Sequence, residues 1–517
     1  MFYSKQLRFI LLLLITAPVT LFAQTEVVIE SPPATANALS GWSTAIDGNW
    51  AVVTAPQKDV ESILSVGEIY FYYYDGDSWV ISQTVEPEHI LPMRNFGFSA
   101  SMHQGTAVIS AVGNHRNDHF AGSIYVYELV DDTWVQADML NSSDSSIGHR
   151  FGHSTDVHQD VIVSGAYMAD GIEEKSGAAY VFEKIDGSWT ETAKLYADDG
   201  LNGDHFGYST HIIDHQTIAI GAYRAEEDTS EEGAVYIFSK SGDNWVQTSK
   251  LTSPNAFMSS SFGYSLTSLQ SEDSNETILF IGAPGSDTGE KKTGAVYVFA
   301  KMNHDWNFDT KFSHDEGSKN NHFGISMAVD GLQTLYVGAS RRSASAAMES
   351  GSLYAFNVMS DAGNITLNPI MEIEPPGAED FAHFGSFVSA DENHIIVSSP
   401  YTNRDSQSNS GSFHFFSDMT VSIDPVEDRV MSYGLNQNYP NPFNPTTTIR
   451  YQLPESNHVR LDVYDILGRQ VATLLNDQVE AGAHTVSFDA SSLASGIYFY
   501  TLKSGGNVFT KKLTLIK

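Results

Sequence analysis

The dipeptide Phe-Gly returns along this chain at a nearly constant interval, and this period constrains the fold more than any other feature. Successive copies lie 55 to 61 residues apart, and a degenerate first copy, Ser40-Gly41, precedes the first Phe-Gly by 56 residues. A fixed period of this length is typical of repeat architectures, so each residue is first of all a position in a repeating unit. The six full copies are Phe96-Gly97, Phe151-Gly152, Phe206-Gly207, Phe262-Gly263, Phe323-Gly324 and Phe384-Gly385.

Every repeat unit contains four short runs of β-branched and aromatic residues separated by turn residues. The copy that begins at Ser261 shows them as SFGYSLTS, TILFIGAP, TGAVYVFA and DWNFDTKF. Four consecutive runs of this kind predict a four-stranded antiparallel meander. Tryptophan recurs in the fourth run, at five positions in register that we interpret as packing positions: Trp79, Trp134, Trp189, Trp245 and Trp306.

Seven such meanders over residues 24–417 predict an all-β fold, a seven-bladed β-propeller whose blades pack around a channel. A linear stack of blades is the competing arrangement, and the two ends of the repeat region favour the ring. The seventh copy stops at GSFHFFSD without a fourth strand, while QTEVVIESP at 24–32 aligns with VQTSKLTSP at 246–254, the fourth strand of another copy. We predict that residues 25–30 close the seventh blade as its outer strand.

The repeats resemble the FG-GAP family, seven-bladed propellers that include the head of integrin α chains. Phe-Gly is literal six times and Gly-Ala-Pro is literal at Gly282 to Pro284, where other copies read TAP, GAY, GAS or SSP. The resemblance covers residues 24–417 and is specific for the fold. It implies a ligand-binding or adhesion module, although one fold hosts many activities.

Integrin-like members of this family hold calcium in loops between the first and second strands, and the resemblance therefore raises calcium as the one possible cofactor. The corresponding connections here, such as Asp47-Gly48-Asn49, are hairpin turns too short to surround an ion. An acidic run at 198–204 comes closer to the spacing of calcium ligands, and an Asp/Gly/Asn turn before a strand explains it equally well. The candidate metal ligands in this run are Asp198, Asp199, Asn202 and Asp204.

Histidine precedes Phe-Gly in three repeat copies, at His205, His322 and His383. Three imidazoles in register could bind a ligand or a metal ion, because neutral imidazole is a common ligand. The same position holds Asn95, Arg150 or Ser261 in other copies, which favours a polar position where the first strand begins. The chain contains no nucleophile-elbow, zinc-helix or phosphate-loop motif, so no enzymatic activity is expected.

The N-terminal residues 1–23 read as a secretory signal peptide. Lys5 and Arg8 precede a compact apolar run that ends in Leu21-Phe22-Ala23, a pattern typical of cleavage after Ala23. Left uncleaved, the same run could anchor the chain, but it is short for a span of about 20 residues. No other stretch is long and apolar enough, so the mature chain is expected to have no transmembrane segment.

Charge and cysteine content exclude several classes of function. The chain has no cysteine, which excludes disulfides, thiol nucleophiles and cysteine-bound metals. Residues 24–435 contain 19 Lys and Arg against 57 Asp and Glu, whereas 436–517 are nearly balanced at 7 against 6. Such acidity argues against nucleic acid as a partner, because phosphate binding depends on clustered basic side chains.

The last part of the chain differs from the repeats. After a linker at 418–435, alternating runs such as VRLDVYD, HTVSFD and IYFYTL in residues 436–517 predict a small Ig-like β-sandwich. This segment resembles the type A C-terminal sorting domain of type IX secretion cargo, in NYPNPFNP at 438–445, VYDILG at 463–468, SGIY at 495–498 and the terminal KKL at 511–513. The resemblance implies recognition by the type IX secretion machinery of a Gram-negative bacterium, and a protein that is secreted or held at the outer cell surface.

Three functions are compatible with this organisation. The first is a binding or adhesion propeller that recognises a protein or glycan through loops on one face, because the loops after the Gly-Ala-Pro position differ most in length and charge. The alternatives are a hydrolase or lyase acting on extracellular polysaccharide, and a structural component of a surface layer. The loops that vary most are those at 114–122, 224–233 and 341–351.

Overall fold

The computed structural model describes residues 25–26, 29, 32–417 and 434–516, apart from short internal gaps. The predicted signal peptide, residues 1–23, and residues 418–433 of the predicted linker lie outside the described residues. Contacts within the chain divide it into two compact units, 1–419 and 420–517. The internal gaps are 89, 114, 117–118, 228–229, 255–258, 271–275, 287–292, 303–304, 314–319, 344–346, 362–363, 376, 436–437, 439–440, 454–455, 481 and 506.

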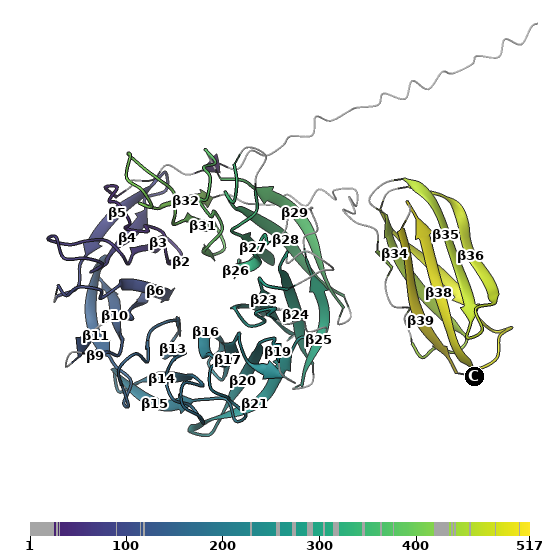
Figure 1. Ribbon diagram of the computed structural model, residues 1–517, viewed down its shortest axis with the longest axis horizontal. Helices are drawn as coiled ribbons and strands as arrows, with labels where there is room; N and C mark the ends of the chain where they lie inside the picture. The colour runs from purple at the N-terminus through teal and green to yellow at the C-terminus, as the bar shows by residue number, and fades with distance from the viewer. Residues whose placement is uncertain are drawn as a thin grey trace, which may run out of the picture. The chain divides into compact units, whose positions relative to one another are not determined.

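The described part of the first unit contains seven four-stranded antiparallel sheets, in the order of the repeat copies. They form a ring around a central opening, with first strands such as β6 and β16 innermost and fourth strands such as β15 and β25 outermost (Figure 1). The all-β propeller fold is thereby confirmed.

Blades 1 to 3 are β2 (Thr44–Asp47), β3 (Trp50–Ala55), β4 (Glu68–Tyr74) and β5 (Trp79–Val85); β6 (Phe96–His103), β7 (Thr106–Ala111), β10 (Ser123–Val130) and β11 (Thr133–Leu140); and β12 (Thr155–His158), β13 (Val161–Ala166), β14 (Ala178–Ile185) and β15 (Ser188–Leu195). Blades 4 to 7 are β16 (Phe206–Asp214), β17 (Thr217–Ala222), β20 (Ala234–Ser241) and β21 (Asn244–Thr252); β22 (Ser265–Gln270), β23 (Thr277–Ala283), β24 (Ala295–Met302) and β25 (Asp305–Phe312); β26 (Phe323–Val329), β27 (Thr334–Ala339), β28 (Ser352–Asp361) and β29 (Asn364–Ile373); and β30 (Val388–Ala390), β31 (His394–Ser399), β32 (Ser412–Ser417) and β1 (Thr25–Glu26).

The Phe-Gly backbone docks against the preceding blade, which explains why this dipeptide is the most regular part of the repeat. The main-chain nitrogen of Phe206 donates a hydrogen bond to the carbonyl oxygen of Ser176 at 3.0 Å. Beside it, Gly177 has φ +96°, and a Cβ at this glycine would lie 2.1 Å from the carbonyl oxygen of Phe206. Only glycine allows the two backbones to approach this closely. The glycines in the same position are Gly67, Gly122, Gly233, Gly294, Gly351 and Gly411.

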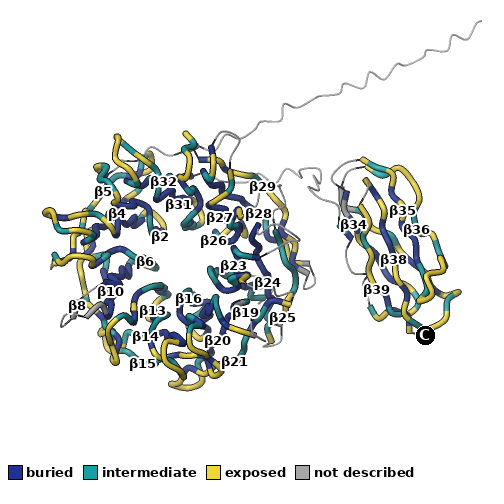
Figure 2. Tube along the Cα trace, viewed as in Figure 1, coloured by how far each residue is buried: buried dark blue, intermediate teal, exposed yellow. Residues whose placement is uncertain are grey.

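The hydrophobic core lies between neighbouring blades rather than within single sheets. One cluster joins Val163 and Val181 of blade 3 to Ile220 and Tyr236 of blade 4. Buried residues occupy the middle of the sheets, while exposed residues lie along the outer strands and loops (Figure 2). The phenylalanines of the six Phe-Gly dipeptides are at most 1% exposed, and the fourth-strand tryptophans are buried except for the half-buried Trp306.

The ring closes between the first and last repeat copies. β1 pairs with β32 in antiparallel fashion, with Thr25 opposite Ser417 and Glu26 opposite Phe416, so the N-terminal segment supplies the fourth strand of blade 7. Of the predicted closing strand at 25–30, only these two residues are described as strand. On the other side of the seam, Ser40 N donates to the carbonyl oxygen of Ser410 at 3.0 Å.

The second unit contains two antiparallel sheets that share one core of buried aliphatic and aromatic side chains. β33 (Gly434–Leu435) pairs with β34, so the first strand begins two residues before the predicted boundary at 436. The Ig-like assignment of this sandwich stays a prediction. One sheet is β33, β34 (Thr446–Leu453) and β37 (Gly482–Asp489), and the other is β36 (Gln470–Val479), β35 (Asn457–Asp465), β38 (Gly496–Ser504) and β39 (Asn507–Leu515).

Candidate functional site

The residue before each Phe-Gly has a left-handed backbone, and this explains the histidines found there. φ is +61° at His205 and +58° at both His322 and His383. Among residues other than glycine, Asn, Asp and His adopt this conformation most readily. The position therefore has a backbone role in every copy, whatever its side chain does. The equivalent residues with positive φ are Leu39, Asn95, Arg150 and Ser261.

The three histidines contact different partners. His205 Nδ1 lies 3.3 Å from the hydroxyl of Tyr223, and the centroid of its ring lies 4.9 Å from that of Tyr167. His383 Nε2 lies 3.3 Å from a carboxylate oxygen of Glu349. Burial lowers the pKa of both His322 and His383, to about 4 at His322. Neutral imidazoles are therefore expected in this region at neutral pH.

Aromatic rings lie side by side at the channel mouth where the first strands begin. They come from the residue after the Phe-Gly position in copies 1 to 5 and from Phe387, two residues after Phe-Gly, in copy 7. We name this set the mouth arc. Neighbouring rings have centroids 4.5 to 5.6 Å apart, and each side chain is half-buried. Sequence reasoning missed this set, although aligning the copies on Phe-Gly would have shown the position to be aromatic in most of them. The mouth arc consists of Phe387, Trp42, Phe98, His153, Tyr208 and Tyr264.

The mouth arc lies on the face that carries the variable loops. Tyr223 opens the variable loop at 224–233, and Tyr167 occupies the same Gly-Ala-Pro position one copy earlier. The ring centroids of Tyr167 and Tyr223 lie 5.6 and 4.3 Å from that of Tyr208. Two of the loops contain small hairpins that the sequence did not predict. They are formed by β8 (His115–Arg116) with β9 (His119–Phe120), and by β18 (Glu226–Glu227) with β19 (Ser230–Glu231).

The acidic run at 198–204 uses its carboxylates within the protein. Asp199 Oδ1 accepts a hydrogen bond from the Tyr236 hydroxyl at 2.9 Å, and its Oδ2 accepts one from Lys250 Nζ at 2.8 Å. Asp204 is buried, and its Oδ2 accepts a hydrogen bond from the main-chain nitrogen of Leu201 at 2.8 Å. These contacts assign Asp199 and Asp204 to packing and turn formation.

The remaining two calcium candidates, Asp198 and Asn202, lie at exposed positions. Their main-chain nitrogens donate hydrogen bonds to the side chains of Gln247 and Glu173 respectively. Among the residues that the structure describes, no group of three or more His, Cys, Asp or Glu side chains is placed to hold a metal ion.

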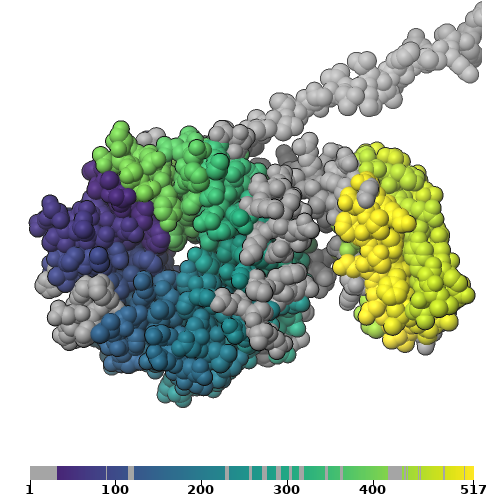
Figure 3. Space-filling view, viewed as in Figure 1, coloured from purple at the N-terminus to yellow at the C-terminus, as the bar shows by residue number. Residues whose placement is uncertain are grey.

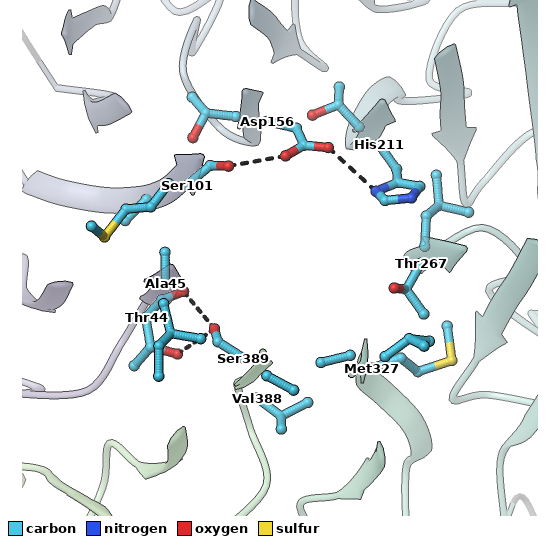
Figure 4. A pocket seen from close by; sticks show the side chains of 18 residues that line it. Thr44, Ala45, Ser101, Asp156, His211, Thr267, Met327, Val388 and Ser389 are labelled. Atoms are coloured by element: carbon cyan, nitrogen blue, oxygen red, sulfur yellow. Dashed lines mark hydrogen bonds and ion pairs between the residues drawn. The ribbon is translucent and has the colours of Figure 1, made fainter. Parts of the chain in front are cut away.

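The central channel contains a cavity of about 300 Å³ lined by first-strand residues of all seven blades. The space-filling view is hollowed at the centre of the ring (Figure 3). Most lining side chains are small or apolar, and Asp156 and His211 are the charged or titratable ones. Figure 4 shows these two side chains together on one side of the cavity, with Thr44 and Ser389 across from them.

A chain of side-chain contacts crosses four consecutive blades in this channel. Ser101 Oγ donates to Asp156 Oδ1 at 2.9 Å, and Asp156 Oδ2 lies 3.3 Å from His211 Nδ1. His211 Nε2 in turn lies 2.8 Å from Ser268 Oγ. No catalytic constellation is visible in the sequence, because these residues are about 55 positions apart in the chain and adjacent only across blades.

Comparison with known proteins agrees with the two-part organisation. Residues 437–517 match the family model of the secretion system C-terminal sorting domain, and residues 134–182 and 189–238 match that of the FG-GAP repeat. No curated protein matches this chain.

Two similar solved structures come from Pyrococcus species. The β-propeller domain of the Trilobed protease from Pyrococcus furiosus, reported to have an open velcro topology, aligns over 69% of this chain and 90% of its own. It is 10% identical, with a TM-score of 0.36. Pyrococcus horikoshii acylaminoacyl peptidase aligns over 80% of this chain and 58% of its own at 10% identity, with a TM-score of 0.37.

The repeats, the ring of sheets and the two family matches define a class, the β-propellers built from FG-GAP repeats. The chain is a β-propeller protein that contains FG-GAP repeats, matched at 134–182 and 189–238, and a C-terminal sorting domain of the type IX secretion system, matched at 437–517. The sorting domain implies export by that system, to the cell surface or the surrounding medium. Within the described residues, no helix is long and apolar enough to cross a membrane.

Proposed function

We propose that this protein is an exported binding or adhesion propeller that recognises a protein or glycan at the mouth arc and the loops around it. The observation that carries the proposal is the continuous run of six half-buried rings across blades 7, 1, 2, 3, 4 and 5. Aromatic side chains supply a large contact area at low entropic cost and are enriched in binding sites. In this proposal ligand capture is the primary role of the propeller, and catalysis is not required for it.

The surroundings of the mouth arc suit a ligand that is partly apolar and partly polar. Burial raises the pKa of the hydroxyls of Tyr208 and Tyr264 above the ordinary value, so both are protonated donors at neutral pH. A few polar groups among aromatic walls are typical of ligand sites, where they fix orientation. The strongly acidic repeat region adds a long-range attraction for cationic groups on a partner.

Export places this site outside the cell. In the proposal, the sorting domain directs the chain through the outer membrane of a Gram-negative bacterium by recognition of residues 436–517. The propeller then acts either free in the medium or attached at the outer surface. A structural surface-layer component is the alternative, and self-assembly of the purified protein measured by light scattering distinguishes it from a ligand binder.

The test is ligand capture by the full mature protein on a glycan array and in a pull-down from extracellular protein. For a ligand retained in either experiment, replacing Tyr208 or Tyr264 by alanine should weaken binding about fivefold or more, because each removes a stacking surface worth about 1 kcal/mol or more. Phe308→Ala is the control, since Phe308 is an exposed ring on the outer strand β25. Failure of both experiments to retain a ligand, or an equal loss in the control, would contradict the proposal.

A further inference from the structure

We propose that Ser268 is a reactive serine in the propeller channel, activated by His211 and able to accept an acyl group from small carboxylic esters. This activity goes beyond ligand binding at the mouth arc and departs from the expectation of a chain without a catalytic set. It rests on the contacts among Ser268, His211 and Asp156, which three consecutive blades bring together.

The distances match the arrangement of a nucleophile, a general base and a group that orients the base. Ser268 Oγ lies 2.8 Å from His211 Nε2, within the reach required for proton transfer. His211 Nδ1 lies 3.3 Å from Asp156 Oδ2 on the opposite side of the ring. Such a constellation is recognised by geometry and roles rather than by the order of residues in the chain.

Asp156 is held in place by four donors, which makes it a rigid positioning residue. Its Oδ1 accepts hydrogen bonds from Ser101 Oγ and from Val157 N, both at 2.9 Å. Its Oδ2 accepts a hydrogen bond from Ile212 N at 2.7 Å, besides facing His211. The carboxylate therefore cannot rotate away from the imidazole without losing several bonds.

The protonation state of Asp156 selects the useful tautomer of His211. Burial raises the pKa of Asp156, but hydrogen bonds from His211, Ile212 and Ser101 outweigh it and hold the pKa below its ordinary value. An ionised carboxylate accepts the Nδ1–H proton, which leaves the lone pair of Nε2 directed at the Ser268 hydroxyl. His211 can then take the proton of that hydroxyl.

The size and lining of the channel define the substrate class. The cavity of about 300 Å³ lies at the lower end of small-molecule sites and excludes bulky chains. Asp156 and His211 line this cavity, and Ser268 adjoins it through its strand neighbour Thr267, which lines it. The apolar part of the lining includes Leu266 of β22 and Met327 of the next blade. Small, mostly uncharged acyl groups such as acetyl or butyryl esters fit this lining.

The chemical step balances without any further oxidant or metal. Ser268 Oγ forms a bond to the ester carbonyl carbon while its proton passes to His211 Nε2. The bond from that carbon to the leaving oxygen then breaks, and the proton on Nε2 is transferred to the leaving alkoxide. Water attacks the acyl-serine by the same route, which releases the carboxylic acid and restores Ser268.

The strand of Ser268 offers a matched control outside the cavity lining. Ser265 lies in the same strand, β22, and its hydroxyl donates a hydrogen bond to the carbonyl oxygen of Gly324 in the next blade at 2.8 Å. It bridges two blades as Ser268 does, but its hydroxyl partner is a carbonyl oxygen instead of an imidazole. A serine that only joins blades should behave like Ser265.

The experiment labels the full mature protein with a small fluorophosphonate, whose phosphorus bonds to serine Oγ as fluoride leaves, and maps the adduct by mass spectrometry. We expect the adduct on Ser268, its loss in Ser268→Ala, and labelling at least about 100-fold slower in His211→Gln, because a general base contributes about 10²–10⁴-fold. Ser265→Ala should label like the unmodified protein. Hydrolysis of p-nitrophenyl acetate should follow the same order among the variants.

Melting temperatures separate a loss of reactivity from a loss of folding. Absence of an adduct on the folded protein, an adduct spread over many serines, or labelling unchanged in His211→Gln would each overturn the proposal. For Asp156, the readout is the ¹⁵N NMR signal of His211, assigned with His211→Gln. We expect the proton on Nδ1 in the unmodified protein and a shift towards Nε2 in Asp156→Asn, and an unchanged tautomer would refute the positioning role.

Discussion

The hydroxyl of Tyr236 donates a hydrogen bond to Asp199 Oδ1 at 2.9 Å, and this contact is a repeat feature of the propeller. Lys250 binds the other carboxylate oxygen and lies 5.7 Å from the centroid of the Tyr236 ring. One blade earlier, Tyr180 and Lys194 bind Asp144 in the same way, at 2.5 and 2.6 Å. A carboxylate, a tyrosine and a lysine therefore link the third and fourth strands to the preceding loop.

This arrangement predicts that Asp199 stabilises the fold rather than binds calcium. Asp199→Ala should lower the free energy of unfolding in urea by about 1–2 kcal/mol, since it removes hydrogen bonds to a tyrosine and an ammonium group. Asp198→Ala, at an exposed neighbouring position, should change it by less than about 0.5 kcal/mol. EDTA should leave the melting temperature of the unmodified protein unchanged. A rise in melting temperature on adding calcium that is absent in Asp199→Ala would restore the calcium assignment.

The inter-blade glycines should be the least replaceable residues of the repeat. A Cβ at Gly177 would lie 2.1 Å from the carbonyl oxygen of Phe206, so Gly177→Ala should cost more than about 3 kcal/mol or prevent folding. Gly187 in the same blade also has positive φ, at +82°, but a Cβ there would meet no other atom within 4 Å. Gly187→Ala should therefore cost only about 1 kcal/mol. Urea unfolding of both variants measures the difference, and equal costs would show that blade contact does not explain Gly177.

The fold was predictable because each repeat copy carries the same local signals. Phe206 and Gly207 occupy one position of the repeat, and the strand-forming runs follow that position at fixed distances in the sequence. Each copy is weak evidence for a blade by itself, but seven copies in register support the same fold. The chain of side-chain contacts that joins Asp156, His211 and Ser268 in the channel was not predictable in this way. Asp156 and His211 both lie five residues after their Phe, whereas Ser268 lies six residues after Phe262, and only the stagger of neighbouring first strands brings them together.

The roles of single residues in the candidate site were also not predictable from the local sequence. From the sequence, His205 was a candidate for binding a ligand or a metal ion. Its φ of +61° shows that backbone conformation explains its presence. Asp199 looked like a calcium ligand because charge and spacing are visible in a sequence, while its partner Lys250 is 51 residues away. Backbone conformation explains His205, and contacts with residues distant in the sequence explain Asp199, so the local sequence pattern reveals neither role.

Buried histidine should make the propeller sensitive to mild acid. Burial lowers the pKa of His153 from its ordinary 6.5 to about 4. Between these values the unfolded chain binds more protons than the folded one, so the stability from this group is complete above pH 6.5 and is lost as the pH falls towards 4. Stability from urea unfolding should therefore decrease over this window.

His153→Phe should flatten this pH dependence, because the phenylalanine side chain cannot be protonated. Phe98 shows that the repeat accepts phenylalanine at this position. The variant loses the contact from Nδ1 to the Tyr208 carbonyl oxygen, 3.1 Å long, so we expect it to be about 1 kcal/mol less stable at pH 7. The gap to the unmodified protein should close by pH 4 to 5. His458→Gln, at an exposed position of the sandwich, is the control. A parallel loss of stability in His153→Phe and the unmodified protein would show that another group causes the acid sensitivity.

The closure of the ring by the N-terminal strand gives the last prediction. Deleting residues 25–30 removes the pairing of Thr25 and Glu26 with β32 and the packing of Ile29 against the cluster around Trp79. We expect the melting temperature to fall by about 1–3 °C, as for a loss of about 1–2 kcal/mol in a domain of this size. The open edge of β32 should also promote association of the variant, which light scattering measures. A synthetic peptide of residues 24–32 should restore the melting temperature by adding the missing strand in trans, whereas a scrambled peptide should not. An unchanged melting temperature in the deletion, or equal rescue by both peptides, would show that the seam is held by contacts such as Ser40 with Ser410 instead.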